Sequence, residues 1–153
     1  MWTNSKTIVK NYGASLGLNY SLHRHISIMA NASFSKLKSV VNNDGFEEAF
    51  NTPRWMVNIG LNQSGLTKNM GICIHYKYQE GFLWQSALAT GFVREIHTVD
   101  AQCTYYFRQQ GLQIKLAGTN ILNRPYISFL GGPTVGTFYY LTLTAELPAV
   151  LPR

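Results

Sequence analysis

Residues 12–22 read YGASLGLNYSL, and their side chains alternate between two kinds. One set holds Tyr, Ala and Leu, and the other holds only Gly, Ser and Asn. Successive residues of a β-strand point to opposite faces, so this alternation predicts a strand with one apolar and one polar face. The same alternation recurs in six further segments, at 26–35, 54–62, 70–79, 98–107, 112–119 and 139–147. The sequence therefore predicts an all-β, antiparallel chain of seven strands.

Short and long connections alternate between the expected strands. The short connections are 23–25, 63–69 and 108–110, and the long ones are 40–53, 80–95 and 120–135. In a meander, all short turns then lie at one end, as do the periplasmic turns of transmembrane β-barrels. Strands of about 11 residues, tilted by about 45°, would cover roughly 25 Å, the height of the apolar band. We expect an antiparallel transmembrane β-barrel segment with seven meander strands, which is a partial barrel.

The composition favours a membrane over a soluble domain. Only 13% of the residues are charged, whereas soluble domains carry about 25%. Aromatic residues gather near the strand ends of the apolar face, as in the interfacial girdles of membrane barrels. We therefore expect the apolar face to meet lipid and the polar face to line an aqueous lumen. The third strand is expected to place Trp55 on the apolar face and Arg54 on the polar one.

Several segments resemble late strands of TonB-dependent outer-membrane receptors. They are Phe50–Pro53 leading into Trp55–Leu61, Tyr76–Phe82 with Trp84, His97–Gln102, Gly118–Tyr126, and Gly131–Pro133 followed by Gly136–Leu143. The resemblance covers residues 50–147 by motif and residues 8–40 by pattern. It implies a receptor of about 22 strands around a plug, which imports a scarce nutrient such as a metal chelate or vitamin.

The resemblance also assigns a place and partners to the chain. Residues 1–147 would be the last seven strands of the barrel, and residues 148–153 a short C-terminal tail. Expected partners are outer-membrane lipid, the rest of the barrel with its plug domain, and the TonB complex through that plug. We recognise no signal peptide, plug or TonB-contacting segment. We therefore expect a fragment, a truncated product or one chain of a split receptor, located in the outer membrane.

The long loops supply candidate ligand contacts. Phe82, Trp84 and Arg94 lie in one loop, and Arg124 and Tyr126 lie in another. Arginine next to aromatic rings suits an anionic, ring-containing ligand. The alternative is that these residues pack neighbouring loops against each other.

Lys10, Lys36 and Lys38 share the parity of the lipid-facing residues. A hairpin around Arg24 would place Lys10 opposite Lys38, near the extracellular end. These ammonium groups could bind lipopolysaccharide phosphates. The alternative is that the strand ends simply emerge into water.

Other residue patterns are less informative. The net charge is +6, but the cations are scattered and no nucleic-acid motif is present, so no nucleic-acid partner is expected. Cys73 and Cys103 have opposite parity, which predicts free thiols. No metal site, cofactor or catalytic group is expected, because the histidines lack partners at ligand spacing and no nucleophile motif occurs.

Polar residues near the strand ends have structural interpretations. We expect Asn120 and Asn123 to form a turn before Pro125. Asp100, Lys77, Lys115 and Glu146 are expected on the lumen wall, where Lys115 and Glu146 would belong to one charge network.

Two other architectures stay open at this point. A complete small outer-membrane barrel of about eight strands, with a structural or adhesive role, would fit the length. A soluble lipocalin-like binding barrel would instead bury the apolar face in an enclosed core.

Overall fold

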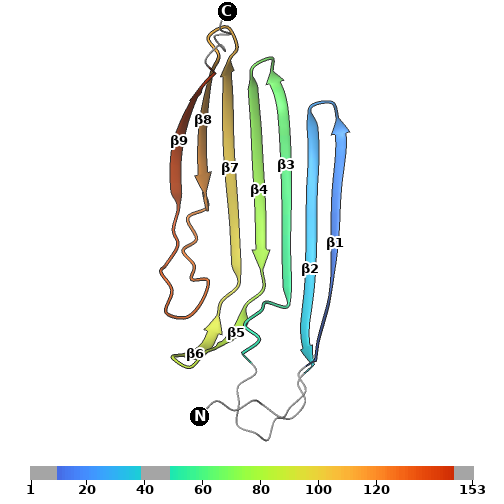
Figure 1. Ribbon diagram of the computed structural model, residues 1–153, viewed down its shortest axis with the longest axis vertical. Coiled ribbons are helices and arrows are strands. Elements are labelled where there is room, and N and C mark those ends of the chain that lie inside the picture. Colours follow the sequence, from blue (N-terminus) through green and yellow to red (C-terminus); the bar gives the residue numbers. More distant parts are fainter. Residues whose placement is uncertain (1–9, 39–48, 147–153) are drawn as a thin grey trace, which may run out of the picture.

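The computed structural model describes residues 10–38 and 49–146, and every regular element in them is a β-strand (Figure 1). The strands are β1 (Lys10–His23), β2 (Ile26–Lys38), β3 (Trp55–Thr67), β4 (Met70–Gln79), β5 (Phe82–Gln85), β6 (Thr90–Val93), β7 (Ile96–Phe107), β8 (Leu112–Thr119) and β9 (Phe138–Ala145). The described residues hold no helix that is long and apolar enough to cross a membrane. The expected tail at 148–153, and Leu147, lie outside the described residues.

Seven strands form one antiparallel meander in the order β1-β2-β3-β4-β7-β8-β9. This confirms the predicted partial barrel of seven strands. The connections 80–95 and 120–137 lie at one end of the sheet, which we call the loop end, and the short turns lie at the other, the turn end (Figure 1). Strands β5 and β6 pair only with each other, and they form a separate hairpin within the segment 80–95, which was expected to be a loop.

The pairing register brings all apolar rows to one face of the sheet. Cross-strand partners on this face include Leu16 with Ala32, Ala30 with Ile59, Ile74 with Ala101, Cys103 with Leu116, and Leu116 with Leu141. A slip of one residue in any pair would move that strand's apolar row to the opposite face. The predicted parity therefore holds across the whole meander.

The apolar face is uncovered. Leu16 is 76% exposed and Leu141 is 69% exposed. Few apolar side chains of the described chain are buried; they include Phe82, Val93, Ile96 and Ala117, which lie mostly at the loop end. A soluble domain of this size would bury such rows in a core. The soluble lipocalin-like alternative requires an enclosed apolar interior, and this sheet has none.

Aromatic rings border the apolar face at both ends. At the loop end, Phe34 lies 4.9 Å from Trp55 between ring centroids, and Tyr78 lies 4.9 Å from His97. At the turn end, Tyr105 lies 4.7 Å from Phe107. Leu, Ile and Ala occupy the band between these rings. Two aromatic rows around an aliphatic band are typical of a strand surface that spans a membrane.

The sheet has two free edges. In the described chain, β1 pairs only with β2 and β9 pairs only with β8. Unpaired backbone N–H and C=O groups in a bilayer cost several kcal/mol each, by general estimates of about 2–7 kcal/mol for an unbonded buried amide. Both edges therefore require partner strands in a membrane.

Candidate functional site

A cavity of about 400 Å³ lies at the loop end, between the β6–β7 connection and the loop that follows β8. Its lining includes Arg94, Arg124 and Tyr126, together with Phe92, Glu95 and His97. The structure thus brings three of the five predicted ligand residues together. The lining carries two guanidinium groups and one carboxylate, so its basic groups outnumber its acidic ones and could bind an anionic group of a ligand. Tyr126 and Phe92 supply aromatic rings.

Asn120 positions the Arg124 side of this cavity. Its side-chain Nδ2 donates to the Arg124 carbonyl oxygen at 2.9 Å, and its Oδ1 accepts from the Arg124 N–H at 3.3 Å. The Asn120 N–H donates to Asp100 Oδ1 at 2.8 Å. Asn120 is 2% exposed with φ +49°, a left-handed conformation that Asn tolerates. The turn expected before Pro125 is therefore present, and Asp100 anchors it.

Phe82 and Trp84 lie outside this cavity. Phe82 is buried and paired with Val93 in the β5–β6 hairpin. The Trp84 ring lies 5.6 Å from the ring of Phe129, which belongs to the loop after β8. These contacts match the alternative of loop-to-loop packing.

A group of cations occupies the apolar side of the sheet at the loop end. Lys10 lies opposite Lys38, and Lys36 lies opposite Tyr12. All three lysines are exposed. The Arg54 guanidinium carbon lies 5.4 Å from the centroid of the Phe34 ring. We call Lys10, Lys36, Lys38 and Arg54 the outward cations.

Arg54 corrects a prediction. Alternation within the third strand placed its side chain on the polar face, but the guanidinium lies over Phe34, whose row is apolar. The strand begins at Trp55, so strict alternation does not extend to Arg54. A cation–π contact of this kind is worth about 0.5–1 kcal/mol at an exposed site.

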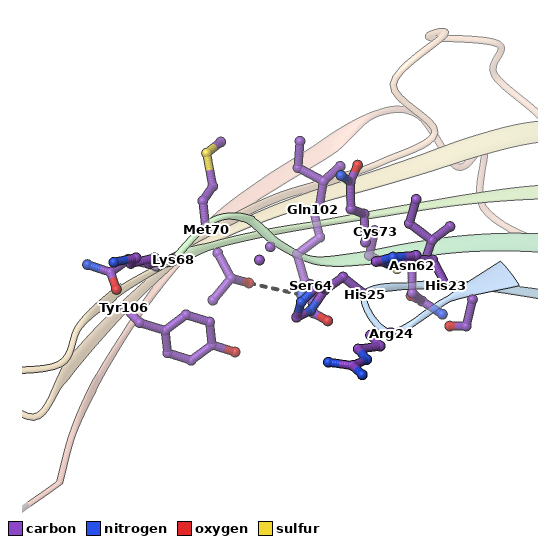
Figure 2. A pocket seen from close by; sticks show the side chains of 18 of the residues that line it. His23, Arg24, His25, Asn62, Ser64, Lys68, Met70, Cys73, Gln102 and Tyr106 are labelled. Carbon is purple, nitrogen blue, oxygen red and sulfur yellow. Dashed lines mark hydrogen bonds between the residues drawn. The ribbon is translucent and has the colours of Figure 1, made fainter. Parts of the chain in front are cut away.

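A second concave site lies on the polar face at the turn end, and Figure 2 shows the side chains around it. This turn-end hollow has a volume of about 580 Å³. It lies between the β1–β2 turn, the β3–β4 turn and strand β7. Its charged or titratable lining residues are His23, Arg24, His25, Lys68, Cys73, Tyr106 and Arg108. The described residues that line it include no Asp or Glu.

Hydrogen bonds between neighbouring turns fix the shape of the hollow. The Ser64 N–H donates to the His25 carbonyl at 2.8 Å, and Arg108 Nη2 donates to the Lys68 carbonyl at 3.0 Å. The register shifts between Ser64 and Thr67, and Gly65 adopts φ +76° within that irregularity. The His25 ring packs beside this glycine. Sequence reasoning treated these turns singly and missed that they form one concave surface.

The remaining polar candidates show no shared site. Both cysteines are free, with Cys73 on the polar face and Cys103 on the apolar face. The described residues contain no group of three or more His, Cys, Asp or Glu that could hold a metal ion. Lys115 and Glu146 share a face, but Lys115 pairs with Thr142. Glu146 lies four residues beyond Thr142, just after β9 ends at Ala145, and the expected charge network of Lys115 and Glu146 stays a prediction.

The sequence matches the outer membrane protein β-barrel family over residues 4–131. The chain therefore belongs to this family, and its location is the outer membrane. Among curated proteins, none matches the sequence.

Similar solved structures are barrels of larger receptors. They include FpvA of P. aeruginosa with a pyoverdine–iron complex (TM-score 0.66, 11% identity), the siderophore receptor PiuA of Acinetobacter baumannii (0.67, 13%) and the FrpB iron transporter of Neisseria meningitidis (0.69, 17%). These matches cover 89%, 89% and 88% of this chain but only 20%, 22% and 23% of those chains. At such identities the likeness shows the fold. It confirms the expected resemblance to the barrel wall of outer-membrane receptors.

Proposed function

We propose that this chain forms seven consecutive strands of a TonB-dependent outer-membrane receptor, at the C-terminal end of its barrel. It contributes wall and extracellular loops to the uptake of a scarce nutrient, such as a metal chelate or a vitamin. The rest of the barrel pairs with β1 and β9, a plug fills the lumen, and TonB acts through that plug. We call this complete object the assembled barrel.

One observation carries the proposal. A full-height apolar face, exposed along seven strands, ends at two strands whose outer edges are unpaired. A seven-stranded sheet cannot span a membrane alone, because its edges would face lipid. The chain needs further strands, and its match covers only 20% and 23% of two of the similar receptor structures.

The size of the barrel tests this proposal. Outer membranes from cells that carry a tagged chain are solubilised, and the folded barrel is isolated without heating. We expect the tag in a particle that contains many more than seven strands together with a lumenal domain. A closed barrel of about eight strands made by this chain alone would contradict the proposal, and so would recovery without detergent.

For the ligand, the loop-end cavity supports an anionic, ring-containing molecule. Arg94 and Arg124 offer paired donors, and Tyr126 offers a ring surface. Arg94→Gln and Arg124→Gln should each lower the uptake of an anionic metal chelate at least tenfold at limiting concentration. Lys77→Gln, on the polar face but outside both the cavity and the turn-end hollow, is the control and should leave uptake unchanged. Equal uptake in all three variants would exclude this cavity.

Phe82 and Trp84 support a different role, because both rings pack within the loops. Trp84→Ala should loosen the contact between the β5–β6 hairpin and Phe129 and increase proteolysis there. Any loss of uptake in this variant should be accompanied by increased proteolysis of the loops. If Trp84→Ala abolished uptake while the loops stayed resistant to proteolysis, Trp84 would be a ligand contact instead.

A second candidate function rests on the outward cations. Like charges directly opposite each other destabilise a sheet, and Lys10 faces Lys38 in the register. Phosphate groups of outer-leaflet lipopolysaccharide would relieve this repulsion. Arg54, whose guanidinium group lies over the Phe34 ring, would be the fourth cation to bind them. Neutralising Lys10, Lys36, Lys38 and Arg54 to Gln should lower the lipopolysaccharide that copurifies with the assembled barrel.

Two comparisons make this second test selective. Lys77→Gln lies on the polar face and should retain normal lipopolysaccharide. Lipid A without phosphates should bind the native and the neutralised barrels equally. Unchanged binding of phosphorylated lipid A by the neutralised variant would show that these strand ends simply emerge into water.

A further inference from the structure

We propose that the turn-end hollow docks a carboxylate-bearing segment of the domain that fills the lumen. This inference rests on the proposed function, because it requires a lumenal domain. The hollow lies on the polar face, and the side chains around it come from the β1–β2 turn, the β3–β4 turn and β7 (Figure 2). A segment that enters the lumen at the short-turn end meets these side chains first.

The charge of the hollow selects an acidic partner. Arg24, Lys68 and Arg108 are basic residues, and His23 and His25 lie beside each other with ring centroids 6.0 Å apart. No carboxylate is among the described lining residues. Cations that line one concave surface repel each other and raise the local concentration of anions. An acidic segment would gain charge-assisted hydrogen bonds there.

The described carboxylates of the polar face are not among the residues that line the hollow. Asp100 Oδ1 accepts the Asn120 N–H at the loop end. Glu146 lines a smaller neighbouring cavity with Arg108, and its backbone N–H donates to Gly111. Arg24 and Lys68 have no carboxylate partner among the described residues, so they are the two positions on which the proposal depends.

The hollow is also preorganised for binding. Arg108 holds the backbone of the β3–β4 turn through Lys68, and Ser64 joins that turn to His25. Docking therefore orders few additional backbone groups, which lowers the entropic cost of binding. The hollow lies on the polar face, which the sheet separates from the apolar face, and a lumenal segment is therefore the occupant that we propose.

Cys73 is a built-in reporter of occupancy. Its free thiol lines the hollow and is partly exposed. In the assembled barrel, a docked segment should shield Cys73 from a neutral, water-soluble maleimide. The labelled Cys73 peptide is quantified by mass spectrometry, so other cysteines in the receptor do not interfere.

Charge reversal then tests the nature of the contact. The double variant Arg24→Glu with Lys68→Glu should label Cys73 at least tenfold faster than the native barrel. Lys77→Glu is the matched control, since it lies on the same strand and face as Cys73 but outside the hollow, and its rate should be native. If the reversal variant fails to assemble, Arg24→Gln with Lys68→Gln should still accelerate labelling several-fold.

Salt gives a measurement on the unmodified protein. Raising ionic strength from about 0.1 M to about 1 M shortens the screening length from about 10 Å to about 3 Å, so labelling should accelerate. Inorganic phosphate at matched ionic strength should act as sodium chloride does. If phosphate alone slows labelling, the hollow is a site for small anions and the proposal fails.

The remaining outcomes are also decisive. Fast labelling of Cys73 in the native barrel, with a lumenal domain present, would show that the hollow is open. That result would overturn the docking proposal but not the proposed receptor function. Slow labelling in every variant would show an occupant held without these charges, which also overturns it. Absence of any lumenal domain would overturn the proposed receptor function itself, and the two failures are thus distinguishable.

Discussion

The two faces of the sheet differ in how their groups are satisfied. On the polar face, small side chains bond across strands, as Ser15 does to Ser33 at 3.2 Å and Asn58 does to Asn31 at 2.8 Å. On the apolar face, side chains such as Leu16 and Leu141 extend from the sheet and remain exposed. The polar face is therefore compatible with water, whereas the apolar face needs an apolar medium. Neighbouring residues of one strand should respond very differently to the same substitution.

The largest expected effect follows from placing the same charge on each face. Leu16→Arg should destabilise the assembled barrel by about 2–4 kcal/mol, the cost of Arg at the bilayer midplane. Gly17→Arg is the matched control, because an added Cβ at Gly17 meets no atom within 4 Å and the side chain points to the polar face. Urea titration in lipid vesicles, followed by tryptophan fluorescence, measures both variants.

The opposite outcome would reverse the assignment of the faces. If Gly17→Arg costs more than Leu16→Arg, the polar face meets lipid. Equal costs would mean that neither face meets lipid at this depth.

A smaller loss is expected at the loop end, where polar bonding extends beyond the sheet. Asn120→Ala removes two side-chain hydrogen bonds to Arg124 and puts alanine at φ +49°. We expect a loss of about 2–3 kcal/mol from these two effects together. Asn120→Gly also removes the side-chain hydrogen bonds but adopts φ +49° without strain. It should therefore be more stable than Asn120→Ala by the cost of that strain. Proteolysis of the 120–137 loop, together with urea titration, separates local from global loss.

On the apolar face, close packing should matter where a ring covers the backbone. An added Cβ at Gly118 would lie 2.7 Å from two Tyr139 ring carbons and 2.8 Å from Ile121 Cγ2. Gly118→Ala should therefore cost about 1–2 kcal/mol by overpacking. Gly17→Ala, at an open position, should cost nothing measurable. An equal result at both glycines would mean that Tyr139 moves aside freely.

The seven strands could be predicted from the sequence because each has a continuous alternation imposed by two different media. Parity alone then assigned the faces of Cys73 and Cys103, and the hairpin at Arg24 gave the pairing of Lys10 with Lys38. The turn at Asn120 was also predictable, because asparagine bonds backbone groups nearby in the chain.

Features that depend on contacts between distant segments were not predictable in this way. The β5–β6 hairpin has only four residues in each strand, too few for a clear alternation. Arg54 lies just outside a strand, where parity fails, and its position depends on Phe34. The turn-end hollow needs three elements in register, and no single turn carries that information. The division of the ligand candidates into a cavity and a packed ring pair likewise depends on how the loops meet.

The smallest expected effect concerns the polar face. Asn58 Nδ2 donates to Asn31 Oδ1 between β2 and β3, and both side chains are exposed. A double-mutant cycle with Asn58→Ala and Asn31→Ala should give a coupling energy of about 0.2–1 kcal/mol, as for other cross-strand pairs. The two alanine variants are measured singly and together by the same urea titration. A much larger coupling energy would indicate that water is excluded from this face at Asn58, and hence that the lumenal domain packs directly on it.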